Sequence, residues 1–275
     1  MTIISDFRKR MTTIGYRQVQ AWYKSSQEII NDFESVGKKL KLFAALPNPP
    51  PLYDWIMGYY ERPSNRRALK GPVMERAKQI IDVGVGTGYL LSRLLKMTDN
   101  EQQIAAVDLS PQMLTNAQNY LKKQRQLTDR INFYLADCQK TPWSDNYFDL
   151  YVSSYLFDLL PEVEVKNALL EMERILKPDG YAILVTMTTE LEDVSWMKKT
   201  FYRLMNELYC LGYERGRWNQ LWKLMFDGYA PHCRPIALGR YLRESSKLMI
   251  VYSKLCRVSL FPVRIYYVRR THDQI

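Results

Sequence analysis

The chain has 275 residues, of which 47% are hydrophobic and 25% are charged. These fractions are typical of a folded globular protein and exclude collagen-like, low-complexity and disordered classes. No apolar run reaches the ~18 residues that a membrane-spanning helix needs, and the N-terminus lacks the hydrophobic stretch of a signal peptide. We therefore expect a cytoplasmic protein without a transmembrane segment.

The net charge of +10 is distributed unevenly along the chain. Residues 1–70 carry 12 Lys and Arg against 6 Asp and Glu, residues 71–199 carry 14 against 18, and residues 200–275 carry 13 against 5. No block of five like charges occurs, and no compact aromatic-basic motif is visible, so we expect no obligatory nucleic-acid partner. Peripheral contact with anionic surfaces stays open as an alternative. The four cysteines form no C-x-x-C pair, so we expect neither a metal site nor a disulfide framework.

The first seventy residues show helix-like apolar spacing and are expected to form an N-terminal helical lid or extension over residues 1–70. The segment PNPPP at 47–51 interrupts them as an extended connector, because proline fixes φ and removes a backbone donor. We assign residues 71–275 to the main domain, with a substrate-covering insertion at about 189–240.

From residue 79 onward, short apolar runs alternate with helix-like segments. The predicted strands are 79–86, 103–110, 131–137, 148–157 and 180–188, and the predicted helices are 89–97, 111–124, 163–176 and part of 194–228. Ser110 followed by Pro111 is typical of a helix start. This alternation predicts an α/β fold with a doubly wound, mostly parallel sheet. Two further runs, near 248–260 and 263–269 and separated by Pro262, predict an antiparallel hairpin at the sheet edge.

A glycine-rich turn follows the first predicted strand. Gly84, Gly86 and Gly88 stand at a strand-to-helix junction, where glycine lets the backbone turn sharply and approach a ligand. Asp108 follows Gly86 by 22 residues, at the end of the next predicted strand, where an acid hydrogen-bonds ribose hydroxyls in such folds. The ligand is therefore expected to contain a nucleoside.

Two local details limit which kind of nucleoside ligand is expected. Tyr89 occupies the position that a dinucleotide-binding turn gives to a small residue, and no Gly-Lys-Ser/Thr follows, which disfavours a pyrophosphate. Asp82 places a carboxylate just before the glycines, and this charge favours a cationic ammonium. An amino acid joined to adenosine fits both observations.

The segment from Tyr53 to Thr188 resembles the class I S-adenosylmethionine-dependent methyltransferases, in particular the subgroup that includes quinone-biosynthesis and small-molecule enzymes. The matching motifs are IIDVGVGTG, VDLS, LADCQKTPWSDNYFDLYVSSYLFDLLPE and LKPDGYAILV. The resemblance implies a Rossmann-like, seven-stranded sheet, with S-adenosyl-L-methionine as cofactor and S-adenosyl-L-homocysteine as product.

The resemblance also implies roles for individual residues. Gly84, Gly86 and Gly88 would line the methionine portion of the cofactor, with Asp82 beside them. Asp108 would bind the ribose, and Ser153 would lie near the sulfonium. Leu109 would contact the face of the adenine, and Asp137 and Cys138 would contact its edge. YDWIMGYYE resembles an N-terminal segment that folds over the cofactor and nominates Tyr60, although Glu61 replaces the expected Asp. Taken singly, Asp137 and Asp149 could be strand-end caps and Cys138 a buried thiol.

The methyl acceptor must be inferred from the residues after the fourth of these strands. Asp158 could steer a cationic amine or accept a proton, and Tyr155 and Phe157 could supply aromatic faces. We therefore nominate Asp158 and Tyr155 as catalytic candidates and all three as substrate-binding candidates. The alternative for Asp158 is a cap of the helix that starts after Pro161.

The insertion after the fifth of these strands adds acidic and aromatic side chains, among which Glu190 and Trp196 are further substrate-binding candidates. Arg234 could bind an anionic group of the substrate or brace the lid. In the alternative interpretation the tryptophans, including Trp218 and Trp222, fill the seam between lid and sheet.

These residues favour methylation of an amine nitrogen in a small organic molecule, such as a specialised metabolite. Carbon or oxygen methylation of an aromatic or quinone-like substrate is the alternative. RNA methylation ranks last, because SSYLF stands where base-amino methyltransferases carry Asn/Asp-Pro-Pro-Tyr/Phe. The oligomeric state is left open between monomer and homodimer.

Overall fold

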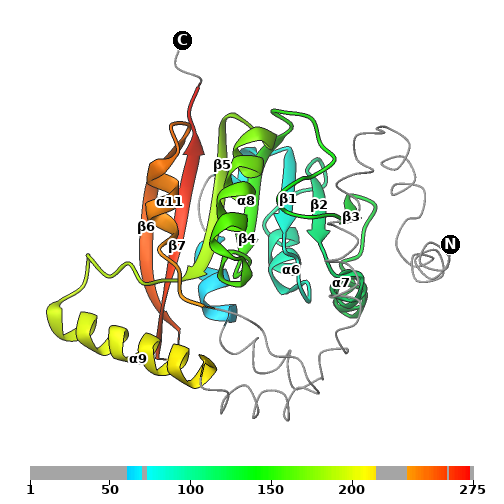
Figure 1. Ribbon diagram of the computed structural model, residues 1–275. Coiled ribbons are helices and arrows are strands. Elements are labelled where there is room, and N and C mark those ends of the chain that lie inside the picture. Colours follow the sequence, from blue (N-terminus) through cyan, green and yellow to red (C-terminus); the bar gives the residue numbers. More distant parts are fainter. Residues whose placement is uncertain (1–60, 70–72, 215–233, 259, 273–275) are drawn as a thin grey trace, which may run out of the picture.

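The computed structural model describes residues 61–69, 73–214, 234–258 and 260–272 (Figure 1). Several predictions fall outside these residues: the N-terminal extension up to residue 60 with Tyr60 and the proline connector, and the part of the insertion that carries Trp218 and Trp222.

Seven strands form one sheet in the order β3-β2-β1-β4-β5-β7-β6. Their bounds are β1 Gln79–Val83, β2 Gln103–Asp108, β3 Ile131–Leu135, β4 Phe148–Ser154, β5 Leu176–Met187, β6 Leu248–Val258 and β7 Phe261–Arg270. The strands β1 to β5 pair in parallel, whereas β7 runs antiparallel to both β5 and β6. This topology confirms the predicted Rossmann-like sheet with an antiparallel edge hairpin.

The helices follow the strands as predicted (Figure 1). A helix covers 61–68, and the others are α5 Val73–Arg76, α6 Tyr89–Leu95, α7 Pro111–Lys123, α8 Glu162–Ile175, α9 Trp196–Glu214 and α11 Leu238–Glu244, with a 3₁₀ turn η2 at Phe157–Leu159. Ser110 caps α7, its hydroxyl accepting from the Met113 N–H at 3.3 Å, with Pro111 as the first helical residue. The predicted start of α7 is thus confirmed, because its side chain satisfies an otherwise unpaired donor.

Two hydrophobic cores cover the two faces of the sheet. Successive strand residues point to opposite faces, so Ile80 packs with α6, α7 and the helix 61–68, whereas Ile81 packs with α8 and α11. The hairpin contributes to both cores, through Ile265 on the first face and Tyr266 on the second. Burial on both faces makes the central strands nearly continuous apolar runs.

Pro262 is not the hairpin turn that the sequence predicted. It is the second residue of β7, and its carbonyl accepts from the Thr188 N–H at 3.1 Å. Proline is tolerated at the start of a strand because no ladder donor is needed there. The turn therefore lies between Val258 and Phe261, earlier than expected.

The carboxyl ends of β1, β2, β4 and β5 meet at one end of the sheet, which lies at the bottom of Figure 1. The helix 61–68 and α9 also lie at this end. In open α/β sheets, ligands bind in the crevice beyond these strand ends. The fold therefore positions a site where the glycine turn, the end of β2 and the exit of β4 come together.

Candidate active site

The glycine turn depends on backbone angles that other residues rarely adopt. Gly84, Gly86 and Gly88 have φ values of 75°, 53° and 87°. A Cβ on Gly88 would lie 2.8 Å from the Ala117 Cα, so glycine also permits the close contact between the start of α6 and α7. A Cβ on Gly84 would lie 3.1 Å from the Leu156 Cβ, which places the turn directly beside the exit of β4.

Asp108 ties the glycine turn to the end of β2. Its Oδ2 accepts from the Gly86 N–H at 2.9 Å and its Oδ1 from the Ser110 N–H at 2.8 Å. Burial raises the pKa of this carboxyl to about 6, although the backbone donors at Ser110 and Gly86 counteract the shift. Leu109 is partly buried beside it. The predicted ribose-binding acid therefore stands against the predicted methionine-binding turn.

Asp82 is fully buried just before the glycines, and neither of its carboxylate oxygens has a hydrogen-bond partner among the described residues. Burial, and then the negative charge of Asp108, raise the pKa of Asp82 to about 8. An unsatisfied buried carboxyl costs stability, and such shifts are common where a ligand later supplies the missing partner. A cationic ammonium would be such a partner.

The adenine-edge candidates lie next to Asp108. The Ala136 N–H donates to the Asp108 carbonyl at 3.3 Å, and Asp137 and Cys138 follow directly, both buried. The Asp137 Oδ1 accepts from the Gln139 N–H at 3.0 Å, which closes a turn after β3. The structure thus brings these residues to the predicted edge, and their contact with the adenine stays a prediction.

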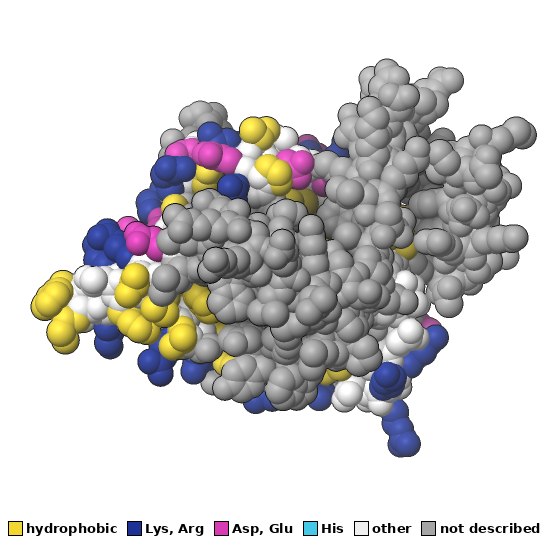
Figure 2. Space-filling view, turned by 60° about the horizontal axis from the view of Figure 1, so that its bottom comes forward, with side chains coloured by type: hydrophobic (Ala, Val, Ile, Leu, Met, Phe, Trp, Pro, Cys, Tyr) yellow, Lys and Arg dark blue, Asp and Glu magenta, His cyan; other side chains and the backbone are white. Residues whose placement is uncertain are grey.

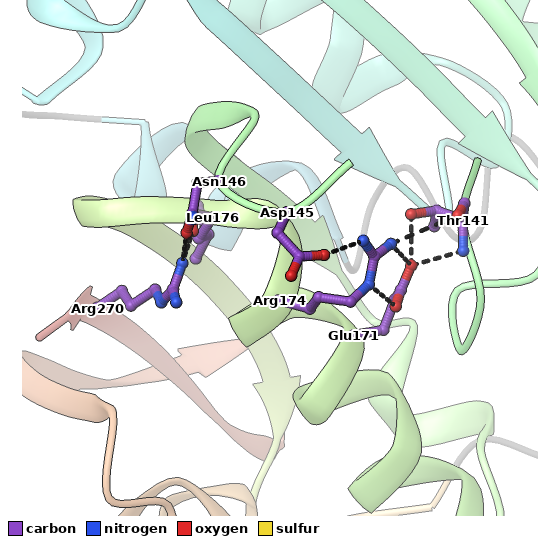
Figure 3. Close-up of polar contacts among 7 residues, drawn as sticks. All are labelled: Thr141, Asp145, Asn146, Glu171, Arg174, Leu176 and Arg270. Atoms are coloured by element: carbon purple, nitrogen blue, oxygen red, sulfur yellow. Dashed lines mark hydrogen bonds and ion pairs between the residues drawn. The ribbon is translucent and has the colours of Figure 1, made fainter. Parts of the chain in front are cut away.

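α8 and β7 brace the connection between β3 and β4 that carries these candidates (Figure 3). The Glu171 carboxylate accepts from both the N–H and the hydroxyl of Thr141, each at 2.6 Å, and pairs with Arg174, which also pairs with Asp145 at 2.7 Å. Farther along, Arg270 donates to the Asn146 side chain and the Leu176 carbonyl. The connection is therefore held at several points, which supports a preformed pocket edge.

The helix 61–68 closes over the exit of β4. The Ser64 and Tyr155 hydroxyls are 2.9 Å apart, and the Ser154 hydroxyl donates to the Asn65 side chain at 2.6 Å. Tyr155 has a φ of 57°, a strained value for this residue, and strain of this kind concentrates at functional sites. Ser153 is buried, and its hydroxyl donates to the Val83 carbonyl at 2.8 Å.

The same helix reaches the glycine turn through Tyr89. The Arg66 Nε donates to the Tyr89 hydroxyl at 3.1 Å, and the Arg62 guanidinium lies 5.0 Å from the centre of the ring. Ser64, Asn65 and these arginines could not be predicted from the sequence. No local pattern around ERPSNRR indicates which strands the helix 61–68 contacts in the folded chain.

Asp158 is fully buried, and both of its carboxylate oxygens already accept hydrogen bonds from the protein. Thr186 donates its hydroxyl to Oδ1, and the Met187 N–H donates to Oδ2 at 3.0 Å. The N-cap of α8 is Pro161, without a side-chain cap, so Asp158 does not cap that helix as the alternative interpretation proposed. It joins η2 to the end of β5, a position that favours a structural role over contact with a substrate.

The remaining acceptor candidates also make internal contacts. Glu190 is buried, and its carboxylate accepts from the Gly239 N–H at 2.8 Å, from Tyr266 and from Arg243. Phe157 is packed in the second core. Arg234 donates from its backbone to the Asp158 carbonyl at 2.9 Å and from its guanidinium to the Leu160 carbonyl at 3.3 Å, which supports the lid-bracing interpretation.

Strand β4 is also anchored at its other end, by Asp149. The Asp149 Oδ2 accepts from the Lys78 and Gln79 N–H groups at 3.0 and 2.8 Å, and its Oδ1 pairs with Lys177. These contacts support its interpretation as a strand-end cap, far from the glycine turn.

A structural role for Asp158 makes a measurable prediction. We expect Asp158→Asn to lower the free energy of unfolding by about 1–3 kcal/mol, because the amide replaces an acceptor oxygen with a donor that faces the Met187 N–H or the Thr186 hydroxyl. Chemical denaturation would measure the loss, and Thr186→Val is the matched variant from the other side of the contact. A variant of unchanged stability whose turnover with amines falls would instead support direct amine recognition.

Comparisons with known proteins agree with this geometry. Residues 80–180 match the family model described as "Methyltransferase domain". The ubiquinone/menaquinone biosynthesis C-methyltransferase UbiE of Erwinia tasmaniensis is 25% identical over 182 residues, which cover 66% of this chain and 67% of that protein. The demethylmenaquinone methyltransferase of Bacteroides fragilis is 29% identical over 169 residues, which cover 59% of this chain and 67% of that protein.

Solved structures share the fold. The N-methyltransferase NodS from Bradyrhizobium japonicum, solved with S-adenosyl-L-homocysteine, has a TM-score of 0.54 at 14% identity and covers 86% of this chain and 99% of its own. A SAM-dependent methyltransferase from Aquifex aeolicus has a TM-score of 0.51 at 17% identity, covering 84% and 97%. At these identities the likeness concerns the fold.

The fold, the site and the matches together define this chain as a class I S-adenosylmethionine-dependent methyltransferase. Within that class its sequence resembles the quinone-biosynthesis methyltransferases. Its cofactor is S-adenosyl-L-methionine, which supplies a methyl group on a positively charged sulfur. The buried, unpartnered Asp82 and the three glycines of positive φ fit a ligand that carries an ammonium close to the backbone.

Proposed function

We propose that this enzyme transfers the methyl group to a ring carbon of an aromatic, quinone-like acceptor. The observation that carries the proposal is the burial of Asp158 and Glu190, the carboxylates on which the expectation of an amine substrate depended. Both carboxylates accept hydrogen bonds from the protein itself. The relatives that match about two thirds of the chain, named as UbiE, add support for carbon as the acceptor atom.

The side chains at the exit of β4 suit a flat, uncharged ring. Tyr155 supplies an aromatic face, Leu156 an aliphatic contact beside Gly84, and Ser64 a hydroxyl. Aromatic and aliphatic walls with a few polar groups are typical of pockets for small organic molecules. We assign Tyr155 as the residue that orients the acceptor.

The chemistry needs alignment and one proton acceptor. A ring carbon of a hydroquinone forms the new bond to the methyl carbon as the bond to sulfur breaks, which leaves a neutral thioether and a positively charged ring. The methylated ring carbon then releases its proton to water, which restores aromaticity. Alignment of the two reacting atoms and exclusion of water supply much of the rate. In this proposal the Tyr155 hydroxyl, which lies 2.9 Å from the Ser64 hydroxyl, hydrogen-bonds a ring oxygen of the acceptor.

A methyl-transfer screen with labelled cofactor tests the proposal. We expect label to appear as a carbon-bound methyl group on reduced quinones that carry an unsubstituted ring position, and not on amines or phenolic oxygens. Tyr155→Phe, which retains the ring, should lower kcat by about 100-fold with unchanged cofactor affinity. Transfer to amines with reduced quinones inert would restore the amine hypothesis in place of this one.

A further inference from the structure

Four apolar side chains stand exposed on the first three turns of α9, and we call this set the α9 ridge. Their exposed fractions are 76% for Trp196, 64% for Met197, 40% for Phe201 and 49% for Leu204. The opposite side of the helix is buried through Tyr202 and Asn206, whose side-chain amide donates to the Thr188 carbonyl at 3.0 Å. The contact with the end of β5 fixes which face points outward, so the ridge is held toward solvent.

Basic side chains border the ridge. Lys198 and Arg203 are exposed and Lys199 is partly exposed, against Glu207 as the one acidic residue in 196–207. Before the helix, Glu192 is exposed, whereas Asp193 is paired with Arg264 at 2.6 Å. Figure 2 shows hydrophobic side chains gathered along α9 at the left of the view, with Lys and Arg side chains beside them.

We propose that the α9 ridge docks on the surface of an anionic lipid bilayer. A helix with Trp, Phe and Leu on its outer face and basic residues beside them lies in the headgroup region, where the apolar side chains insert and the cations meet phosphates. None of the helices that the structure describes is long and apolar enough to cross a membrane.

The positive charge around the α9 ridge favours an anionic lipid surface, and not a second copy of the chain, as its binding partner. The chain carries a net charge of +10, and two ridges brought face to face would oppose Lys198 and Arg203 with their own copies. An anionic membrane instead attracts these groups. The inference goes beyond methyl transfer and does not depend on the identity of the acceptor.

Docking at this place also has a consequence for the site. α9 lies at the end of the sheet where the parallel strands finish, the same end as the glycine turn and the exit of β4 (Figure 1). A protein held through the ridge therefore presents this end of the sheet to the bilayer. An apolar acceptor dissolved in the membrane would then have a short path to the site.

Vesicle flotation tests the proposal with the full chain. We expect the protein to float with vesicles made of equal parts phosphatidylglycerol and phosphatidylcholine, to float less at high salt, and to stay off vesicles of phosphatidylcholine alone. Replacing Trp196, Met197 and Leu204 together with serine should weaken binding by about tenfold or more. Lys198→Glu with Arg203→Glu should weaken it at least as much, at about fivefold for each lost charge.

A matched control comes from α8, where Val163 and Leu170 are also exposed, by 71% and 63%. Val163→Ser with Leu170→Ser removes exposed apolar surface elsewhere and should leave vesicle binding unchanged. Retained affinity for S-adenosyl-L-homocysteine shows that each variant is folded. Equal loss in both sets of variants, or a wild-type protein that never floats, would overturn the proposal.

Sedimentation distinguishes lipid binding from dimerisation through the α9 ridge. If the serine variant of the ridge converts a dimer into a monomer without any vesicle binding by the wild type, the ridge is a contact between two copies and the lipid proposal is wrong. Methyl transfer to a water-soluble acceptor is measured without vesicles, so failure of docking and failure of the proposed function are distinguishable.

Discussion

Replacing Asp108 with alanine is expected to weaken binding of S-adenosyl-L-homocysteine by at least about 100-fold. The carboxylate assigned to the ribose would accept from its hydroxyl groups, and each hydrogen bond to a charged group contributes about 1.5–3 kcal/mol. Its loss also leaves the N–H groups of Gly86 and Ser110 without this acceptor, although the Gly84 and Val85 N–H groups still donate to the Val107 carbonyl at the end of β2. Isothermal titration calorimetry would measure the affinity, and thermal stabilisation by the ligand should disappear.

Asp149 provides a matched control for Asp108. It too accepts from two backbone N–H groups, those of Lys78 and Gln79, but it lies at the other end of the sheet. We expect Asp149→Ala to lower the melting temperature and to leave the affinity for the ligand unchanged. An equal loss of affinity in both variants would mean that Asp108 acts through general stability, and the site assignment would fail.

Replacing Asp82 with asparagine is expected to raise the free energy of unfolding and to lower the affinity for the cofactor. The ordinary pKa of this carboxyl is 3.8, and burial raises it to about 8 in the folded chain. Between these values the folded state binds a proton that the unfolded state has lost, so stability falls as the pH rises from about 4 to about 8. At pH 7 the difference amounts to about 4 kcal/mol, which is the upper limit for the stabilisation by Asp82→Asn.

We expect the same carboxyl to make cofactor binding depend on pH. A bound ammonium favours the ionised form of Asp82, so binding near pH 7 should release a proton and affinity should rise with pH until about pH 8. Calorimetry in buffers of different ionisation enthalpy measures the released proton. The Asn variant should bind with no release from this site and a flatter pH profile; an unchanged profile would show that another group is responsible.

The parts of this enzyme that depend on neighbours in the chain could be read from the sequence. The strand-turn-helix order around Gly84, Gly86 and Gly88, the cap at Ser110 and the position of Asp108 all follow from short-range patterns, because turn angles and caps involve residues only a few positions apart. The antiparallel hairpin was predicted as well, but its turn was misplaced at Pro262, since proline can also begin a strand.

The hydrogen-bond partners of the acidic side chains near the expected acceptor site, Asp158 and Glu190, were decided by tertiary structure. Asp158 finds its partners at Thr186 and Met187, 28 and 29 residues away, and Glu190 finds Tyr266 76 residues away. The contact of Ser64 with Tyr155 spans 91 residues. A carboxylate in a sequence can bind a substrate or a distant backbone N–H equally well, and only the packing of the sheet against its helices determines which partner it meets. The sequence by itself therefore determined the cofactor, whereas the folded chain decided which residues remain for the methyl acceptor.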